Sequence, residues 1–124
     1  MRLLLVCLGG AVGTGARYLF GSWVQRVGGA GFPYGTLIIN AVGSFLLVAV
    51  MHLSLERGMI SVDARVVLGT GVMGGFTTYS TFNYETFRFI QQGSFALGAL
   101  YLAATVIGCL VAGGLGLILA RALS

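Results

Sequence analysis

The chain has 124 residues, of which 57% are hydrophobic and only 8% are charged, and its formal net charge is +4. A soluble globular domain carries about 25% charged residues, so this composition does not supply a surface that faces water on all sides. It predicts an integral membrane protein and excludes the usual soluble enzymes and nucleic-acid-binding modules, since the positive charge comes from a few scattered residues.

Four stretches are apolar enough to cross a bilayer, because a membrane helix needs about 20 mostly apolar residues. They cover residues 3–24, 35–55, 66–91 and 95–119, and the connections between them are short. We therefore expect an all-α membrane protein with four transmembrane helices per subunit, in one domain over residues 1–124. An even number of spans would place both termini on one side of the membrane.

Small residues recur at four-residue spacing in three of these spans. They are Gly9 and Gly13, Gly71 and Gly75, and Gly108, Ala112 and Gly116. Such ladders let membrane helices approach closely, and they serve either pairing between two copies or packing within one subunit. The first span also contains Arg17, which either extends its charge to the membrane surface or attracts an anion.

The second span carries a polar face. Thr36, Asn40, Gly43 and Ser44 follow one another at steps of four, three and one, so they lie on the same side of a helix. The amide of Asn40 offers two N–H donors and a carbonyl acceptor. Two interpretations stay open, namely a hydrogen bond to another helix and a contact with a transported substrate.

The third span is predicted to break between Gly74 and Thr78. Gly74 and Gly75 are followed closely by Thr77 and Thr78, and each glycine costs about 1 kcal/mol relative to alanine inside a helix. A break at membrane depth leaves N–H and C=O groups that must be buried in protein, line water or bind an ion. Free carbonyls at the end of the first half suit a cation, whereas free N–H groups at the start of the second suit an anion.

Beyond this break the sequence predicts two stripes on one helix. The polar stripe consists of Thr77, Thr81, Glu85 and Arg88, and the aromatic stripe of Tyr79, Phe82 and Phe89. Glu85 and Arg88 are spaced to form an ion pair near the membrane surface. The aromatic rings either face lipid or the core, or turn their electropositive edges toward an anion.

In the fourth span, Tyr101, Thr105 and Cys109 are four residues apart. Tyr101 is either part of this polar face or an anchor at the membrane interface. His52 is the only histidine, and no combination of residues typical of a catalytic site or a nucleotide-binding loop is present. We expect no enzymatic activity.

The arginines give only a weak preference for one orientation in the membrane. Arg2, Arg57, Arg65 and Arg121 lie on the side of the termini, and Arg26 and Arg88 lie opposite, with Arg17 nearer the second group. The positive-inside rule therefore leaves two possibilities. Either the chain inserts in both orientations and pairs as an antiparallel dimer, or its preference for one orientation is small.

Three motifs together resemble the bacterial fluoride channels of the Fluc (CrcB) family, over essentially the whole chain. They are Gly9-Gly10-x-x-Gly13-x-x-x-Arg17-Tyr18, Gly35-Thr36-Leu37-x-x-Asn40-x-x-Gly43 and Gly74-Gly75-Phe76-Thr77-Thr78-Tyr79-Ser80-Thr81-Phe82-x-x-Glu85. Each motif alone is only weakly specific. Their joint order and spacing in a four-span chain of this size are strongly specific.

The resemblance implies an antiparallel, dual-topology homodimer in the bacterial inner membrane, with two fluoride pores that each use both subunits. It also implies a structural Na⁺ on the dimer axis, bound by the backbone carbonyls of Gly74 and Thr77 in each copy. The expected partners are thus fluoride, a second copy of the chain and the lipid bilayer.

The resemblance further implies which side chains line the fluoride pathway. They are the pore asparagine Asn40, the ring-edge position Phe82, the hydroxyls of Ser80, Thr81 and Thr105, the fourth-helix Tyr101, the pore-mouth Glu85 and the vestibule Arg17. The chain departs from the family pattern at Tyr79, which stands where the first ring-edge phenylalanine is common, and Cys109 stands where some relatives have a hydroxyl.

The function implied is passive export of fluoride, which relieves its toxicity. The alternative is a proton-coupled exporter like the small multidrug-resistance proteins, which needs a carboxylate deep in the bilayer. Glu85 is the only carboxylate within the predicted spans, and it lies near a helix end. A third possibility, an assembly subunit that transports nothing, is disfavoured by the broken polar helix.

Overall fold

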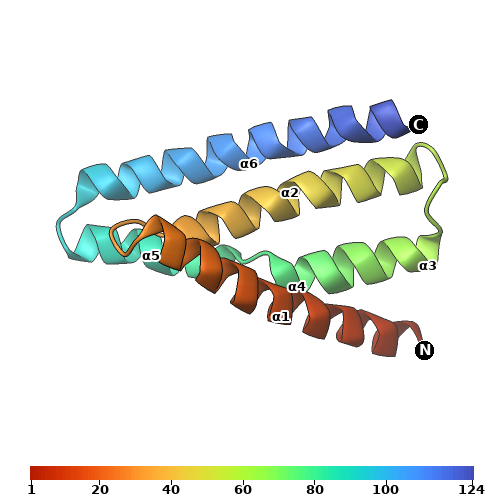
Figure 1. Ribbon diagram of the computed structural model, residues 1–124, viewed down its shortest axis with the longest axis horizontal. Coiled ribbons are helices and arrows are strands. Elements are labelled where there is room, and N and C mark those ends of the chain that lie inside the picture. The colour runs from red at the N-terminus through yellow and green to blue at the C-terminus, as the bar shows by residue number, and fades with distance from the viewer.

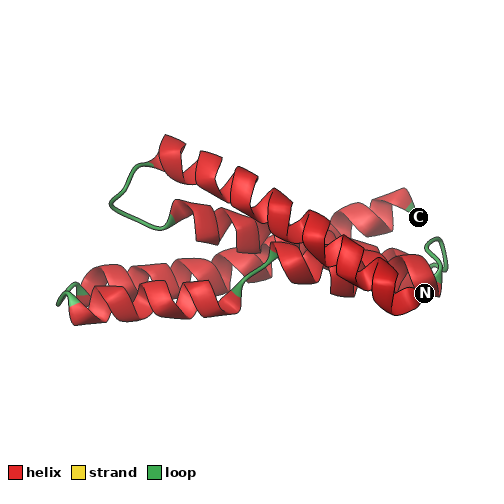
Figure 2. Cartoon of the chain, turned by 90° about the horizontal axis from the view of Figure 1, so that it is seen from below, coloured by secondary structure: helices red, strands yellow, loops and turns green.

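The computed structural model describes all 124 residues, and the chain is helical apart from its short connections (Figures 1 and 2). The long helices are α1 (Arg2–Gly28), α2 (Tyr34–Leu55) and α6 (Phe95–Leu123). Between α2 and α6 the chain forms α3 (Val62–Arg65), the π-helix η1 (Val66–Met73), α4 (Gly74–Phe76) and α5 (Tyr79–Gln91). The predicted all-α architecture is confirmed.

Three helices, α1, α2 and α6, are long and apolar enough to cross a membrane. The predicted third span corresponds to α3, η1, α4 and α5. Two non-helical residues separate α4 from α5, so no single helix of this span is long enough to cross a membrane by itself. The chain is thus a multi-pass membrane protein. Both termini lie at the same end of the molecule, and the α1–α2 and α5–α6 connections lie at the other (Figure 1).

Most helices extend beyond the apolar stretches that predict them. The first helix ends at Gly28 rather than at residue 24, and the last ends at Leu123 rather than at residue 119. The third segment begins at Val62 rather than at residue 66, because the Ser61 hydroxyl accepts a hydrogen bond from the Ala64 amide (3.1 Å) and caps the helix. Hydropathy therefore predicts only the apolar part of each helix, and the helix itself continues further along the chain.

The interior is small and consists largely of glycine. Only 16 of the 124 residues are buried. Half of these are glycines, namely Gly9, Gly13, Gly35, Gly43, Gly71, Gly98, Gly113 and Gly116. The high glycine content therefore serves close contact between helix backbones, as expected for helices that associate in lipid.

The glycine ladders of the first and third spans pack against each other within the subunit. A Cβ atom on Gly13 would lie 2.0 Å from the Val72 carbonyl oxygen, and one on Gly75 would lie 2.5 Å from the Gly10 carbonyl oxygen. These positions thus require glycine where α1 crosses η1 and α4. Of the two roles left open by the sequence, packing within one subunit is the one observed for these ladders.

The ladder in α6 is divided between two surroundings. A Cβ on Gly116 would lie 2.2 Å from the Phe45 carbonyl oxygen, so this glycine allows α6 to pack closely along α2. Gly108 has no atom within 4 Å of its Cβ position and is free of such contact.

The third span breaks at Thr77 and Thr78, at the end of the predicted interval. Both residues are extended, with φ and ψ of −82° and 159° at Thr77 and −151° and 115° at Thr78. Gly74 and Gly75 remain helical, so poor helix propensity of the glycines does not explain the break. The extended conformation instead falls on two β-branched residues, which favour it.

Candidate functional site at the broken helix

The break is held by one side chain from α2. The Asn40 Nδ2 atom donates to the Thr78 carbonyl oxygen (2.9 Å), and the Thr78 amide donates to Asn40 Oδ1 (2.8 Å). Gly43, on the same face, leaves room for Thr77, whose Cγ2 atom would lie 2.1 Å from a Cβ there. The polar face of the second span therefore meets the break, and Asn40 makes the helix–helix hydrogen bonds that were one of its two interpretations.

This pairing changes the hydrogen bonding of the Gly74 carbonyl. In a continuous α-helix the Thr78 amide would donate to Gly74, four residues earlier. Here it donates to Asn40, so the Gly74 oxygen lacks its helical donor, and Gly74 is exposed on the surface of the subunit. The Thr77 amide still donates to the Met73 carbonyl (3.0 Å).

Arg17 reaches the same break from α1. Its Nη1 atom donates to the Thr77 carbonyl oxygen at 3.3 Å, and the side chain is partly buried. Arg17 thus turns toward the break in the third segment. The guanidinium brings a positive charge to the point where the backbone is irregular.

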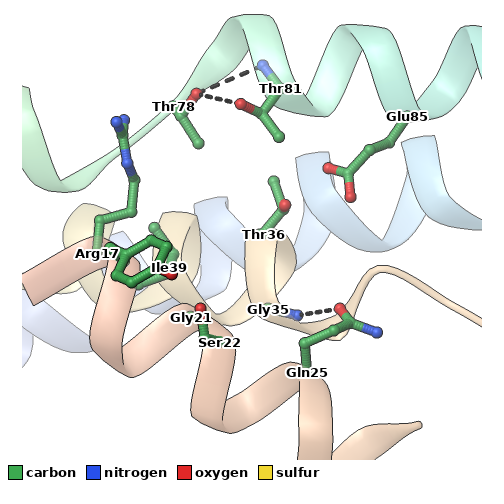
Figure 3. A pocket seen from close by; sticks show the side chains of 11 residues that line it. Arg17, Gly21, Ser22, Gln25, Gly35, Thr36, Ile39, Thr78, Thr81 and Glu85 are labelled. Carbon is green, nitrogen blue, oxygen red and sulfur yellow. Dashed lines mark hydrogen bonds between the residues drawn. The ribbon is translucent and has the colours of Figure 1, made fainter. Parts of the chain in front are cut away.

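A cavity of about 320 Å³ opens beside Arg17 (Figure 3). Polar side chains reach it from three helices. They are Arg17, Ser22 and Gln25 from α1, Thr36 from α2, and Thr81 and Glu85 from α5, with Thr78 at the break. The Thr78 hydroxyl, which bonds the Thr81 hydroxyl (3.0 Å) and accepts from the Thr81 amide (3.4 Å), caps the start of α5.

Glu85 bonds to α6 rather than to its own helix. The Tyr101 hydroxyl donates to Glu85 Oε1 at 3.2 Å. The only ion pair in the structure joins Arg2 to Asp63 at the other end of the molecule, so the ion pair between Glu85 and Arg88 suggested by their spacing does not form. The reason is that Glu85 turns into the bundle, whereas Arg88 is exposed.

The predicted aromatic stripe divides into two environments. Phe82 is 6% exposed, and its ring meets Tyr101 edge to face, with centroids 5.2 Å apart. Phe89 also packs on Tyr101. Tyr79, in contrast, is 76% exposed on the outside of the subunit, although its ring still touches that of Phe82 (5.7 Å).

The predicted hydroxyl positions are not brought together within one subunit. Ser80 and Thr81 are exposed at the start of α5. Thr105 is buried in α6, and its Oγ1 atom has no hydrogen-bond partner. Tyr101, one turn earlier, is fully buried, so it belongs to the polar face and is not an interfacial anchor.

Sequence reasoning missed two residues, Gln25 and Phe32, beside a second cavity of about 450 Å³. This cavity lies between the α1–α2 connection and the α5–α6 turn, and Arg88, Phe89 and Gln92 also line it. Both missed residues belong to a region that the sequence presents as a connection. The amide of Gln25, next to a glycine-rich connection, was the only signal that could have indicated a role.

A helical membrane protein with a break at membrane depth and polar cavities beside it has the architecture of a transport protein. The chain belongs to the CrcB family, since residues 4–117 match the family described as "CrcB-like protein, Camphor Resistance (CrcB)".

Curated relatives match nearly the full length of the chain. A protein from Anaeromyxobacter sp. (strain K), named fluoride-specific ion channel FluC, is 56% identical over 120 residues, covering 97% of this chain and 95% of the relative. Proteins with the same name from Sorangium cellulosum and Thermus thermophilus are each 50% identical, over 122 and 107 residues. The matches cover 98% and 82% of this chain, and 96% and 84% of these relatives.

Proposed function

We propose that this protein is a fluoride-selective ion channel that exports F⁻ passively from the bacterial cytoplasm across the inner membrane. The observation that carries the proposal is its 56% identity, over nearly the full length, to a relative named for fluoride. The site is consistent with that chemistry. A small anion gives up its hydration shell only where N–H and O–H donors and ring edges replace it.

The cavity beside Arg17 supplies such donors. The guanidinium attracts an anion, and the hydroxyls of Ser22, Thr36 and Thr81 line the same space. From there the path we propose runs along α5 toward Glu85, which borders both cavities. Export needs no coupling to another solute, because HF that enters from acid surroundings dissociates inside and F⁻ leaves down its electrochemical gradient.

We further propose that the working unit is an antiparallel homodimer with two pores. Gly74, Tyr79, Ser80 and Thr81 are exposed on either side of the break in the third segment. Polar side chains and irregular backbone are costly in lipid unless protein covers them. A second copy packed against the break would cover them and would complete the pathway that one subunit leaves open.

The same surface fits the structural sodium ion that the family resemblance implies. The Gly74 carbonyl lacks its helical donor because Asn40 takes the Thr78 amide. The Thr77 carbonyl already attracts the cationic Arg17 side chain, and a carbonyl oxygen has a second lone pair for another partner. Unwound backbone carbonyls are typical ligands of Na⁺ in membrane proteins. Two such oxygens from each copy would hold the ion on the dimer axis.

Efflux from proteoliposomes tests the function directly. Vesicles containing the purified protein and loaded with fluoride should release it rapidly when a K⁺ ionophore allows charge balance, and matched chloride-loaded vesicles should release almost nothing. Protein-free vesicles are the control. Fluoride that stays trapped, while an organic cation exchanges for protons, would instead indicate the multidrug exporter and overturn the channel.

A further inference from the structure

The α1–α2 connection is tied to α1 by a single side chain. Gln25 Nε2 donates to the carbonyl oxygens of Gly29 (2.5 Å) and Phe32 (2.9 Å), and Gln25 Oε1 accepts from the Gly35 amide (3.0 Å). An amide has two N–H donors and one carbonyl oxygen, so all of these groups are engaged. The residues bonded lie on both sides of Pro33, and Gln25 therefore fixes the path of the whole connection.

The connection carries an aromatic ring into the bundle. The Phe32 ring meets Tyr101 edge to face, with centroids 5.4 Å apart and planes at 86°. Phe82 and Phe89 also pack on the Tyr101 ring, and Tyr101 has no exposed surface. Such aromatic pairs contribute about 0.5–1.5 kcal/mol beyond their buried area, so they hold the tyrosine side chain in one position.

The position of that ring determines where its hydroxyl oxygen lies. The hydroxyl donates to Glu85 Oε1. Glu85 lines both the cavity beside Arg17 and the second cavity, between the α1–α2 connection and the α5–α6 turn. Gln25 lines both cavities as well. The two residues therefore stand at the boundary that any ion moving between the cavities must pass.

We infer that Gln25 and Phe32 are positioning residues for this boundary: Gln25 fixes the connection, the connection holds Phe32 against Tyr101, and Phe32 keeps the tyrosine hydroxyl on Glu85. The inference rests on the proposed channel function. Without Phe32 the Tyr101 ring gains freedom, and Glu85 loses its donor for part of the time. The hydrogen-bonded arrangement of Tyr101 and Glu85 between the two cavities is then lost, and fluoride conductance falls. Neither Gln25 nor Phe32 needs to touch the ion.

A double-mutant cycle separates this role from a general structural one. Phe32→Ala is made in the wild-type protein and in Tyr101→Phe, and fluoride conductance is measured in planar bilayers. Because Phe32 acts through the tyrosine hydroxyl, we expect its removal to lower conductance about tenfold in the wild type and less than about twofold in Tyr101→Phe. Equal losses in both backgrounds, or no loss in a folded Phe32→Ala protein, would overturn the inference.

Further variants keep the result interpretable. Phe32→Tyr retains the ring and should conduct like the wild type, whereas Gln25→Met keeps side-chain length without hydrogen bonds and should repeat the pattern of Phe32→Ala. Phe95→Ala removes an exposed ring at the same end of the molecule and should have no effect. If Phe32→Ala does not fold, the cycle is run with Gln25→Met. A wild-type protein that conducts no fluoride refutes the channel itself, whereas a conducting protein with an additive cycle refutes only this inference.

Discussion

At the scale of single residues, Asn40 stabilises the break in the third segment. Its Oδ1 atom replaces the helical acceptor that the Thr78 amide loses where the third span is broken, and its Nδ2 atom donates to the Thr78 carbonyl. An unpaired N–H or C=O group in hydrocarbon costs several kcal/mol, so the break is stable only because an amide, with a donor and an acceptor side by side, lies opposite. The sequence placed Asn40 on a polar helix face, but its partner lies 38 residues away and had no local signal.

Asn40→Asp tests this pair of hydrogen bonds. A carboxylate still accepts from the Thr78 amide but places a second oxygen against the Thr78 carbonyl. We expect a loss of about 1–3 kcal/mol in stability, the usual consequence of leaving a buried hydrogen-bonding group unpaired. Fluoride conductance should also fall. Thermal unfolding in detergent and bilayer recordings measure the two effects.

The matched control is Asn83→Asp, which makes the same change at an exposed position of α5. Its unfolding temperature should stay at the wild-type value. If both variants lose the same stability, the introduced charge is responsible and the pairing with Thr78 is not.

At the scale of elements, the molecule depends on how closely α1 crosses the third segment. Sequence patterns could identify the glycine ladders but could not say which helix each ladder meets, because that depends on contacts between segments far apart in the chain. The same difficulty affected the break. Gly74 and Gly75 suggested it by their low helix propensity, yet they are helical, and Gly75 serves the contact with Gly10 instead.

Two alanine substitutions in α1 measure this contact. Gly13→Ala would place a Cβ atom 2.0 Å from the Val72 carbonyl oxygen, so α1 must move away. We expect a destabilisation of about 1–3 kcal/mol, as for other overpacked interiors. Gly15→Ala adds the same atom where nothing lies within 4 Å, and it should leave stability unchanged or slightly raised because alanine favours helix.

Unfolding of both proteins in the same detergent provides the comparison. A Gly13→Ala protein as stable as Gly15→Ala would mean that the crossing of α1 with the third segment is not tightly packed.

At the scale of the whole molecule, length and hydropathy were sufficient to predict four membrane segments and an all-helical fold. They could not identify Gln25 and Phe32, because the roles of these residues come from a connection that folds back on the bundle. Charge gave the weakest prediction, since it left the orientation of the chain undecided. That question belongs to the assembly and is open to direct test.

Shifting arginines across the molecule should separate the two orientations. One variant combines Arg26→Gln with Ser124→Lys, and the other combines Arg57→Gln and Arg121→Gln with Gln91→Lys, at an exposed position outside both cavities. By the positive-inside rule each should insert mainly one way. If the dimer is antiparallel, cells expressing either variant alone should become sensitive to fluoride, and cells expressing both should be resistant. Full resistance with one fixed orientation, verified by a reporter at the C-terminus, would argue for a parallel or monomeric channel.

The pairing of Asn40 with Thr78 also bears on the order in which the chain is made. Asn40 is synthesised 38 residues before Thr78, so α2 has already left the ribosome when the irregular backbone of the third segment follows it. The Thr78 backbone can therefore find its hydrogen-bond partner within its own chain, before any second copy is met. In the proposed dimer, each newly made subunit would present an already broken helix to its partner, and assembly would join two preformed surfaces.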